Sequence, residues 1–176
     1  MKFLSNESIV RHKAYLHERK LLLSVLYKSS PEICGKGGVE IMRSKRTLKY
    51  GEEALELISE IELHELYFRS FSDLLAPSLP VRERFGSEAN FLYELEMLSR
   101  AERCGFLLVY ADSKNKLSFC IENGYEILFS KIKPLLAIDL WEHAYFYDYG
   151  FDRKKYLKSA LASLDFGKIN DFYKSS

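Results

Sequence analysis

The chain has 176 residues, of which 47% are hydrophobic and 29% are charged, and its 26 basic side chains nearly balance its 25 acidic ones. This composition is typical of a globular protein, and it lacks the excess positive charge by which proteins bind nucleic acid or an anionic membrane surface. The three cysteines are widely spaced and predict neither a disulfide framework nor a zinc site. No apolar run reaches the roughly 18 residues of a membrane span, and Met1–Val10 lacks the apolar segment of a secretory signal, so we expect a cytoplasmic protein.

The N-terminal segment is predicted to be a long helix. Apolar residues and His12 recur at spacings of three, four and seven between Ser5 and Lys28, as one face of a helix requires. Ser5 is a residue type that caps helix N-termini. Residues 29–38 contain one proline and three glycines, so we expect a loop there.

A second and a third helix are expected between residues 51 and 103. Residues 51–70 predict a helix with four aliphatic residues, His64 and two phenylalanines on one face, namely Ala54, Leu57, Ile58, Ile61, His64, Phe68 and the following Phe71. Residues 72–86 contain two prolines and are predicted to form a connection. Ser87 is then expected to cap a third helix that runs to about Arg103.

The pattern changes to strands after Gly105. Residues 106–111 and 117–121 are two apolar segments joined by a polar turn, which predicts a β-hairpin. Residues 135–140 follow a proline and are expected to form a third, buried strand. The polar segment after Arg153 predicts a solvated C-terminal helix. Helices, a small antiparallel sheet and further helices make an α+β chain with a helical N-terminal half.

Three of the four histidines lie where core residues are expected. His12 and His64 lie on the apolar faces of two predicted helices, and His143 follows Asp139 by four residues, just past the third strand. Three imidazoles and one carboxylate suit iron or manganese and leave a coordination position open for solvent or substrate. From these residues alone two interpretations stay open: a metal site, or core histidines beside an aspartate that caps a helix.

Short motifs along nearly the whole chain resemble those of one known family and run in that family's order. Residues 139–146 (DLWEHAYF) resemble the specific motif DxWEHAYY, and residues 149–157 (YGFDRKKYL) resemble its continuation YxNxRPxYL. Further matches are SNESIVRH at 5–12 to SxETMxxH, LHELYF at 63–68 to WNHxFYW, FGSEANF at 85–91 to FGSxxxF, and GFLLV at 105–109 to GWxWLV. By these motifs the chain resembles the iron/manganese superoxide dismutases.

The resemblance implies a fold, a metal and a reaction. It implies a helical-hairpin N-terminal lobe, residues 1–82, followed by a C-terminal lobe, residues 83–176, with a small three-stranded antiparallel sheet and surrounding helices. One iron or manganese ion per chain would lie between the lobes and be bound by His12, His64, Asp139 and His143. The implied reaction is the dismutation of superoxide to oxygen and hydrogen peroxide, carried out by a homodimer.

Several residues near the implied metal depart from the family. The family's gateway tyrosine position holds Lys20, for which we predict a catalytic or steering role; its alternative is a solvent-exposed lysine. A polar pair that meets across the family's dimer is replaced by Leu16 and Phe146. Of the family's aromatic cage Trp141 remains, and the other positions hold Leu63, Phe68 and Phe106.

Two glutamates have roles that the resemblance leaves open. Glu60 replaces the glutamine that iron-type members place one helical turn before His64. It would donate a hydrogen bond to bound solvent, bind the metal, or lie in solvent on the helix face. Glu142 matches a glutamate that reaches the last histidine ligand of the partner subunit, and its alternative is an ordinary ion pair within the chain.

Two functions therefore follow, and a third is weaker. The first is an active superoxide dismutase, favoured by the complete ligand set. The second is a metal-binding or protein-association module of the same fold with weak or altered activity, favoured by the changes around the ligands. The third is an oxidase-like or peroxidase-like metalloenzyme using the same site. The choice between iron and manganese does not follow from the ligands.

Overall fold

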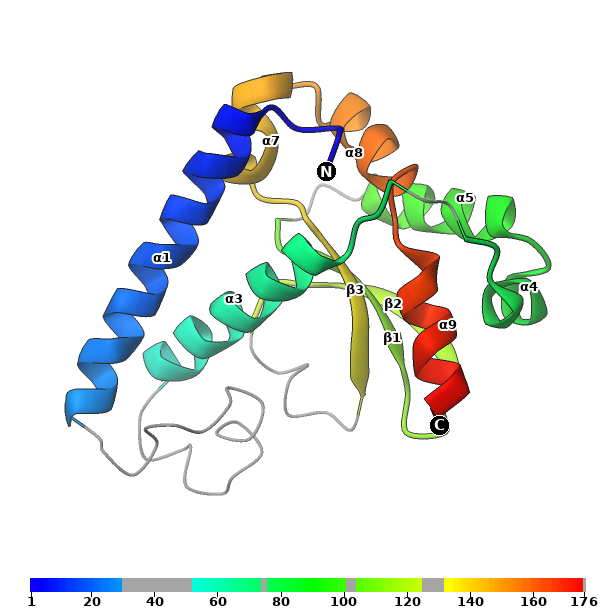
Figure 1. The fold of residues 1–176 in the computed structure, drawn as a ribbon, viewed down its shortest axis with the longest axis horizontal. Helices are drawn as coiled ribbons and strands as arrows, with labels where there is room; N and C mark the ends of the chain where they lie inside the picture. Colours follow the sequence, from blue (N-terminus) through cyan, green and yellow to red (C-terminus); the bar gives the residue numbers. More distant parts are fainter. Residues whose placement is uncertain (30–51, 74–75, 101–103, 125–131, 176) are drawn as a thin grey trace.

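The structure is a computed structural model that describes residues 1–29, 52–73, 76–100, 104–124 and 132–175. Among the described residues, the helices that come first in the chain are α1 (Asn6–Ser29), α3 (Glu52–Arg69), α4 (Leu79–Phe85) and α5 (Glu88–Ser99). A three-stranded sheet follows, and then helices α7 (Glu142–Tyr149), α8 (Arg153–Leu161) and α9 (Phe166–Ser175). Figure 1 shows α1 and α3 on one side of the sheet, α4, α5 and α9 on the other, and α7 and α8 across one end. Within the described ranges, no helix combines the length and the apolarity that crossing a membrane requires.

The two long helices predicted for the N-terminal half are present. Helix α1 covers Asn6–Ser29, and the Ser5 hydroxyl caps it by accepting a hydrogen bond of 3.1 Å from the backbone N–H of Ser8. Helix α3 covers Glu52–Arg69. The loop expected over residues 29–38 lies, after Ser29, outside the described residues.

The connection expected over residues 72–86 is partly wrong, because it contains helix α4 (Leu79–Phe85). Pro80 lies in the first turn of α4, where a proline removes no hydrogen bond that the helix would otherwise make. Helix α5 (Glu88–Ser99) then begins at Ser87, whose hydroxyl accepts from a backbone N–H at 3.1 Å, as predicted. Helix α5 ends at Ser99, before the end predicted near Arg103.

The three-stranded antiparallel sheet is confirmed, with strand order β2-β1-β3. Strand β1 covers Phe106–Ala111, β2 covers Leu117–Glu122 and β3 covers Lys133–Asp139. The register of β1 and β3 places Phe106 opposite Asp139. Neighbouring strands lie about 5 Å apart, so the side chains of Phe106 and Asp139 leave the backbone close to each other.

The single solvated helix expected after Arg153 is wrong, because two helices follow it. Helix α8 covers Arg153–Leu161 and α9 covers Phe166–Ser175. Helix α8 buries one face, including Tyr156 and Leu157, while its lysines lie in solvent. The lysines dominate the composition of this segment and hide the apolar face that holds it against the core. Helix α7 (Glu142–Tyr149) connects the sheet to α8.

One buried apolar cluster extends from α3 through the sheet to α8 and α9. Ser70, at the end of α3, ties this helix to β3: its hydroxyl donates to the backbone carbonyl of Leu66 at 2.7 Å and accepts from the N–H of Ala137 at 2.7 Å. The fold is therefore α+β, as the sequence predicts. The division into lobes at residues 82 and 83 stays a prediction.

Candidate metal centre

Four side chains from α1, α3, α7 and the end of β3 converge on one point. The carboxylate oxygen Oδ2 of Asp139 lies 3.1 Å from Nε2 of His12, 3.3 Å from Nε2 of His64 and 3.0 Å from Nε2 of His143. His12 and His143, which are 131 positions apart in the chain, therefore lie close together. The spacing of these residues in the sequence could not decide whether they would meet. Among the described residues this is the group of histidine, cysteine and acidic side chains with metal-binding geometry.

Among the described residues, His12 has no hydrogen-bond partner. Its side chain is completely buried, and neither ring nitrogen makes a hydrogen bond with a described residue. The 3.1 Å approach to Asp139 therefore lacks hydrogen-bond geometry. Burial lowers the pKa of His12, which keeps its ring neutral. A neutral, buried and unpartnered imidazole is costly unless its lone pair is used, and a metal ion would use it.

His64 is oriented by its own helix. Its Nδ1 donates to the backbone carbonyl of Glu60 at 2.7 Å, which leaves Nε2 to face Asp139. Burial would lower the pKa of His64, but the hydrogen bond and charge of Asp139 outweigh burial and raise it. The Nε2 atoms of His64 and His143 lie 3.1 Å apart.

The turn between β3 and α7 fixes Asp139. The backbone N–H of Trp141 donates to Oδ1 at 2.8 Å, so Oδ2 is the atom left to face the histidines. The Tyr156 hydroxyl donates to the Asp139 carbonyl at 2.8 Å, inside the core. Burial would raise the pKa of Asp139, but its close polar contacts with the three histidines outweigh burial and hold the pKa well below its usual range. Asp139 is therefore an anion that three imidazoles face.

The four donors fit a transition-metal ion. Their ligand atoms all lie within 4.8 Å of one another. An ion at about 2.1 Å from nitrogen and oxygen donors requires separations of about 3–4 Å between them. Three neutral nitrogens and one anionic oxygen are also the donor types that divalent iron and manganese accept. The unpartnered ring of His12 and these separations together indicate that the residues present could hold one ion.

A cavity of about 330 Å³ borders the centre on the side of His143. The His143 side chain is 30% exposed, whereas those of the other three residues are buried. The cavity is lined by apolar residues, including Leu63, Phe106 and Trp141, and by polar residues, including Glu56 and Glu60. Three of the four positions of the expected cage thus line one cavity, and the fourth, Phe68, packs against the His12 ring at 4.9 Å.

Glu60 also lines this cavity, where it contacts a residue that the sequence analysis missed. Its carboxylate accepts a short hydrogen bond from the Tyr15 hydroxyl and lies 3.7 Å from Nε of Arg19. Burial, then the neighbouring Glu60, raises the pKa of Tyr15 to about 12, so the phenol keeps its proton. The signal that could have found Tyr15 is its position three residues after His12, almost one helical turn away.

Lys20 lies in a different groove, together with Leu16 and His17. Its ammonium group pairs with Glu65 at 2.5 Å. His17 is exposed, as expected for a surface residue. The structure therefore brings Glu60 to the cavity beside His143 and leaves Lys20 on another side of α1.

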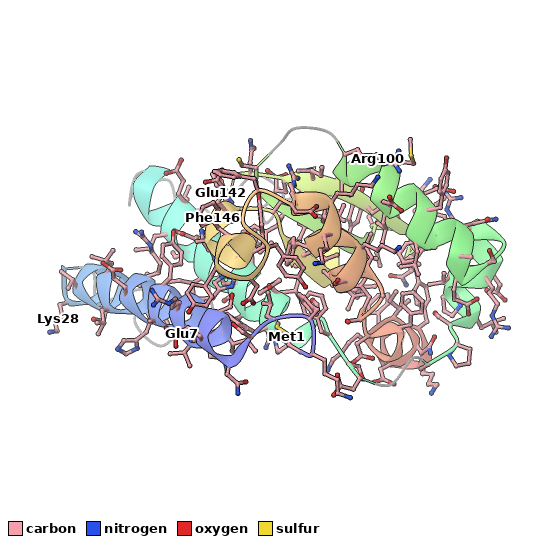
Figure 2. The ribbon with its side chains drawn as sticks, turned by 90° about the horizontal axis from the view of Figure 1, so that it is seen from above. Met1, Glu7, Lys28, Arg100, Glu142 and Phe146 are labelled. Carbon is pink, nitrogen blue, oxygen red and sulfur yellow. The ribbon has the colours of Figure 1, made fainter. Side chains whose placement is uncertain are left out.

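Glu142 lies on the outer surface, in the first turn of α7. Its carboxylate makes no ion pair with another residue in the part of the chain that the structure describes. Figure 2 looks onto the end of the molecule formed by α7 and labels Glu142 and Phe146 on this helix. Phe146 is 46% exposed and contacts Phe151, which is 87% exposed.

Two superoxide dismutases are similar to this chain in sequence. The superoxide dismutase (Mn) 1 of Halobacterium salinarum is 31% identical over 121 residues, which cover 65% of this chain and 60% of that protein. The superoxide dismutase (Fe) of Bacteroides fragilis is 31% identical over 115 residues, which cover 60% of each chain. This chain thus spans less than two thirds of the length of these relatives.

The family comparison covers the C-terminal half of the chain. A model of the C-terminal domain of iron/manganese superoxide dismutases matches residues 78–172, more than half of the sequence. This range contains Asp139, His143 and the whole sheet, whereas His12 and His64 lie before it. The match and the four converging side chains lead to one conclusion. The chain belongs to the iron/manganese superoxide dismutase family.

Proposed function

We propose that this protein binds one iron or manganese ion through His12, His64, Asp139 and His143 and dismutates superoxide. The observation that carries the proposal is the convergence of three imidazole Nε2 atoms on one carboxylate oxygen, with the buried His12 ring left without a hydrogen bond. Family membership supplies the reaction, and the geometry supplies a binding site. When bound, the ion would provide one-electron redox chemistry, oxidising one superoxide and reducing the next.

The chain's own residues would control access and orientation. Because His143 is the exposed ligand, superoxide would approach from the cavity beside this ring. Leu63, Phe106 and Trp141 would restrict the number of water molecules there, which strengthens electrostatic interactions at the site. Asp139, held as an anion by its histidine neighbours, would offset part of the positive charge of the ion.

The test compares two histidine variants of the full chain. His64→Ala removes one of four ligands and is expected to lose most of the bound metal and the dismutase activity. His17→Ala removes an exposed histidine in α1 and serves as the matched control. Metal content is measured by elemental analysis, and superoxide consumption by a direct optical assay. Equal metal content in the wild type and in His64→Ala would rule out the site.

A second candidate is a metal-binding or protein-association module with little turnover. The observation that favours it is the charge of the cavity, because both Glu56 and Glu60 line it. Carboxylates at the entrance repel an anionic substrate, although Arg19 lies close enough to Glu60 to offset part of this charge. A metal-loaded protein that consumes superoxide no faster than the free ion would favour this candidate.

We also propose that the chain forms a homodimer through the end of the molecule at α7. Exposed aromatic side chains gather there, namely Trp141, Phe146 and Phe151, and aromatic residues are enriched at interfaces. Glu142 begins the same helix and makes no ion pair with a described residue, so it is available to a partner subunit. Sedimentation is expected to give a mass near twice 20.5 kDa, and a monomer at micromolar concentration would refute the dimer.

A further inference from the structure

Tyr15 makes three contacts that together connect the candidate centre to charged groups around it. Its ring stacks on the His143 imidazole, with ring centroids 4.5 Å apart and an angle of 28° between the planes. Its hydroxyl donates to the carboxylate of Glu60. The guanidinium of Arg19 covers the ring, with its central carbon 4.7 Å from the centroid.

The stacking matters because His143 is the most exposed of the four residues. Its side chain is 30% exposed, and both polar contacts of its ring that involve described residues are made by Nε2, with Asp139 and His64. Stacking against Tyr15 limits rotation of the imidazole about χ2. The distribution of this torsion angle is broad in histidine side chains when nothing packs against the ring. A ligand that is already oriented binds an ion more tightly than one that must be ordered on binding.

The hydroxyl of Tyr15 acts on a second element. It holds the Glu60 side chain at the cavity, and the backbone carbonyl of the same residue orients His64. Arg19 lies 3.7 Å from the Glu60 carboxylate, beyond hydrogen-bond distance. The Tyr15 hydroxyl is therefore the group that fixes where this negative charge lies relative to the centre. A fixed charge beside a redox ion changes its reduction potential.

We propose that Tyr15 is a positioning residue of the metal centre, which orients His143 through its ring and fixes the Glu60 carboxylate through its hydroxyl. This assignment rests on the proposed function, because it requires a metal at the four ligands. It separates two effects within one side chain. The ring acts on metal affinity, and the hydroxyl acts on the reduction potential.

The experiment uses two substitutions in the full chain loaded with Mn²⁺. Tyr15→Leu removes the ring and is expected to weaken Mn²⁺ affinity by about 10-fold or more, the usual cost of losing a partner of a ligand. Tyr15→Phe keeps the ring, so its Mn²⁺ dissociation constant should equal that of the wild type, while its reduction potential shifts. Tyr147→Phe is the control, since this exposed tyrosine lies on α7 and its hydroxyl makes no hydrogen bond with a described residue.

A double substitution tests whether the hydroxyl acts through Glu60. Glu60→Gln should shift the potential, and adding Tyr15→Phe to it should produce little further change, because the two residues act as a unit. Unchanged affinity in Tyr15→Leu, or an unchanged potential in Tyr15→Phe, would overturn this assignment alone. A wild-type protein that binds no Mn²⁺ or Fe²⁺ would overturn the proposed function as well.

Discussion

Replacing Asp139 by asparagine is expected to abolish the stabilisation that Mn²⁺ gives the protein while leaving the metal-free fold intact. Asparagine has nearly the same shape, and its side-chain oxygen can still accept the 2.8 Å hydrogen bond from the Trp141 backbone. What disappears is the negative charge that three Nε2 atoms approach within 3.3 Å. The metal-free variant should melt below the metal-free wild type, because a carboxylate whose pKa is lowered by folding stabilises the folded state in its charged form. The effect of Mn²⁺ is therefore measured as a shift within each protein.

The size of the effect follows from linkage between binding and folding. Free Mn²⁺ at 100 times its dissociation constant stabilises the folded state by about 2.7 kcal/mol. In a chain of 176 residues, each kcal/mol raises the melting temperature by about 2–4 °C, so the wild type should gain roughly 5–11 °C. If the asparagine variant binds about 100-fold more weakly, the same Mn²⁺ concentration stabilises it by only about 0.4 kcal/mol, or roughly 1 °C.

Calorimetry or circular dichroism, with and without Mn²⁺, measures the shift in melting temperature of the wild type and of the variant. Asp73→Asn is the matched control, because this aspartate is exposed and pairs with Lys2 far from the histidines. The control should keep the full metal-dependent shift. If Asp139→Asn keeps it too, the carboxylate does not bind the ion and the four-ligand centre is refuted.

Three further predictions concern stability, pH and charge. Ser70→Ala leaves the buried N–H of Ala137 without its acceptor, so chemical denaturation should show a loss of about 1–3 kcal/mol in the free energy of unfolding. The metal requires neutral imidazoles, and the raised pKa of His64 means that this ring still holds a proton at its ordinary pKa of about 6.5. Mn²⁺ affinity, followed by titration calorimetry, should therefore keep rising as the pH increases past that value, and a pH-independent affinity would contradict this. Lys20→Gln tests the predicted steering role: a slower reaction with a flatter dependence on ionic strength supports it, and an unchanged salt dependence leaves Lys20 as a surface residue paired with Glu65.

Much of the fold follows from the periodicity of the sequence, and the failures have identifiable causes. Helix α1 was predictable from the spacing of its apolar residues and from Ser5 as its cap, and the β1–β2 hairpin from two apolar segments joined by a polar turn. Helix α4 was missed because Pro80 was taken to interrupt regular structure, although a proline is compatible with a first turn. Helix α8 was not separated from α9, since its buried face is narrow and its sequence is rich in lysine.

The candidate centre was less predictable than the fold. From their spacing alone, His12 and His64 could be either metal ligands or ordinary core residues. Local sequence patterns do not determine that α1, α3 and the end of β3 pack together in the tertiary structure. The resemblance selected the four residues, and the structure brings their donor atoms together. Glu60 was predicted to point inward or outward with no means of choosing, since the choice depends on a hydrogen bond from another helix.

Lys20 and Tyr15 show that a residue's position relative to the family's motifs does not always predict its place in the structure. A helix advances by about 100° per residue, so from His12 the side chain of Tyr15 lies about 60° to one side and that of Lys20 about 80° to the other. A single helix therefore presents the two residues to different neighbours, and only Tyr15 faces the cavity beside His143. Metal ligands transfer by position because an ion fixes their number and geometry. The residues around them are free to move to other positions, provided that a hydroxyl and a charged partner still reach the cavity, as Tyr15 and Glu60 do here.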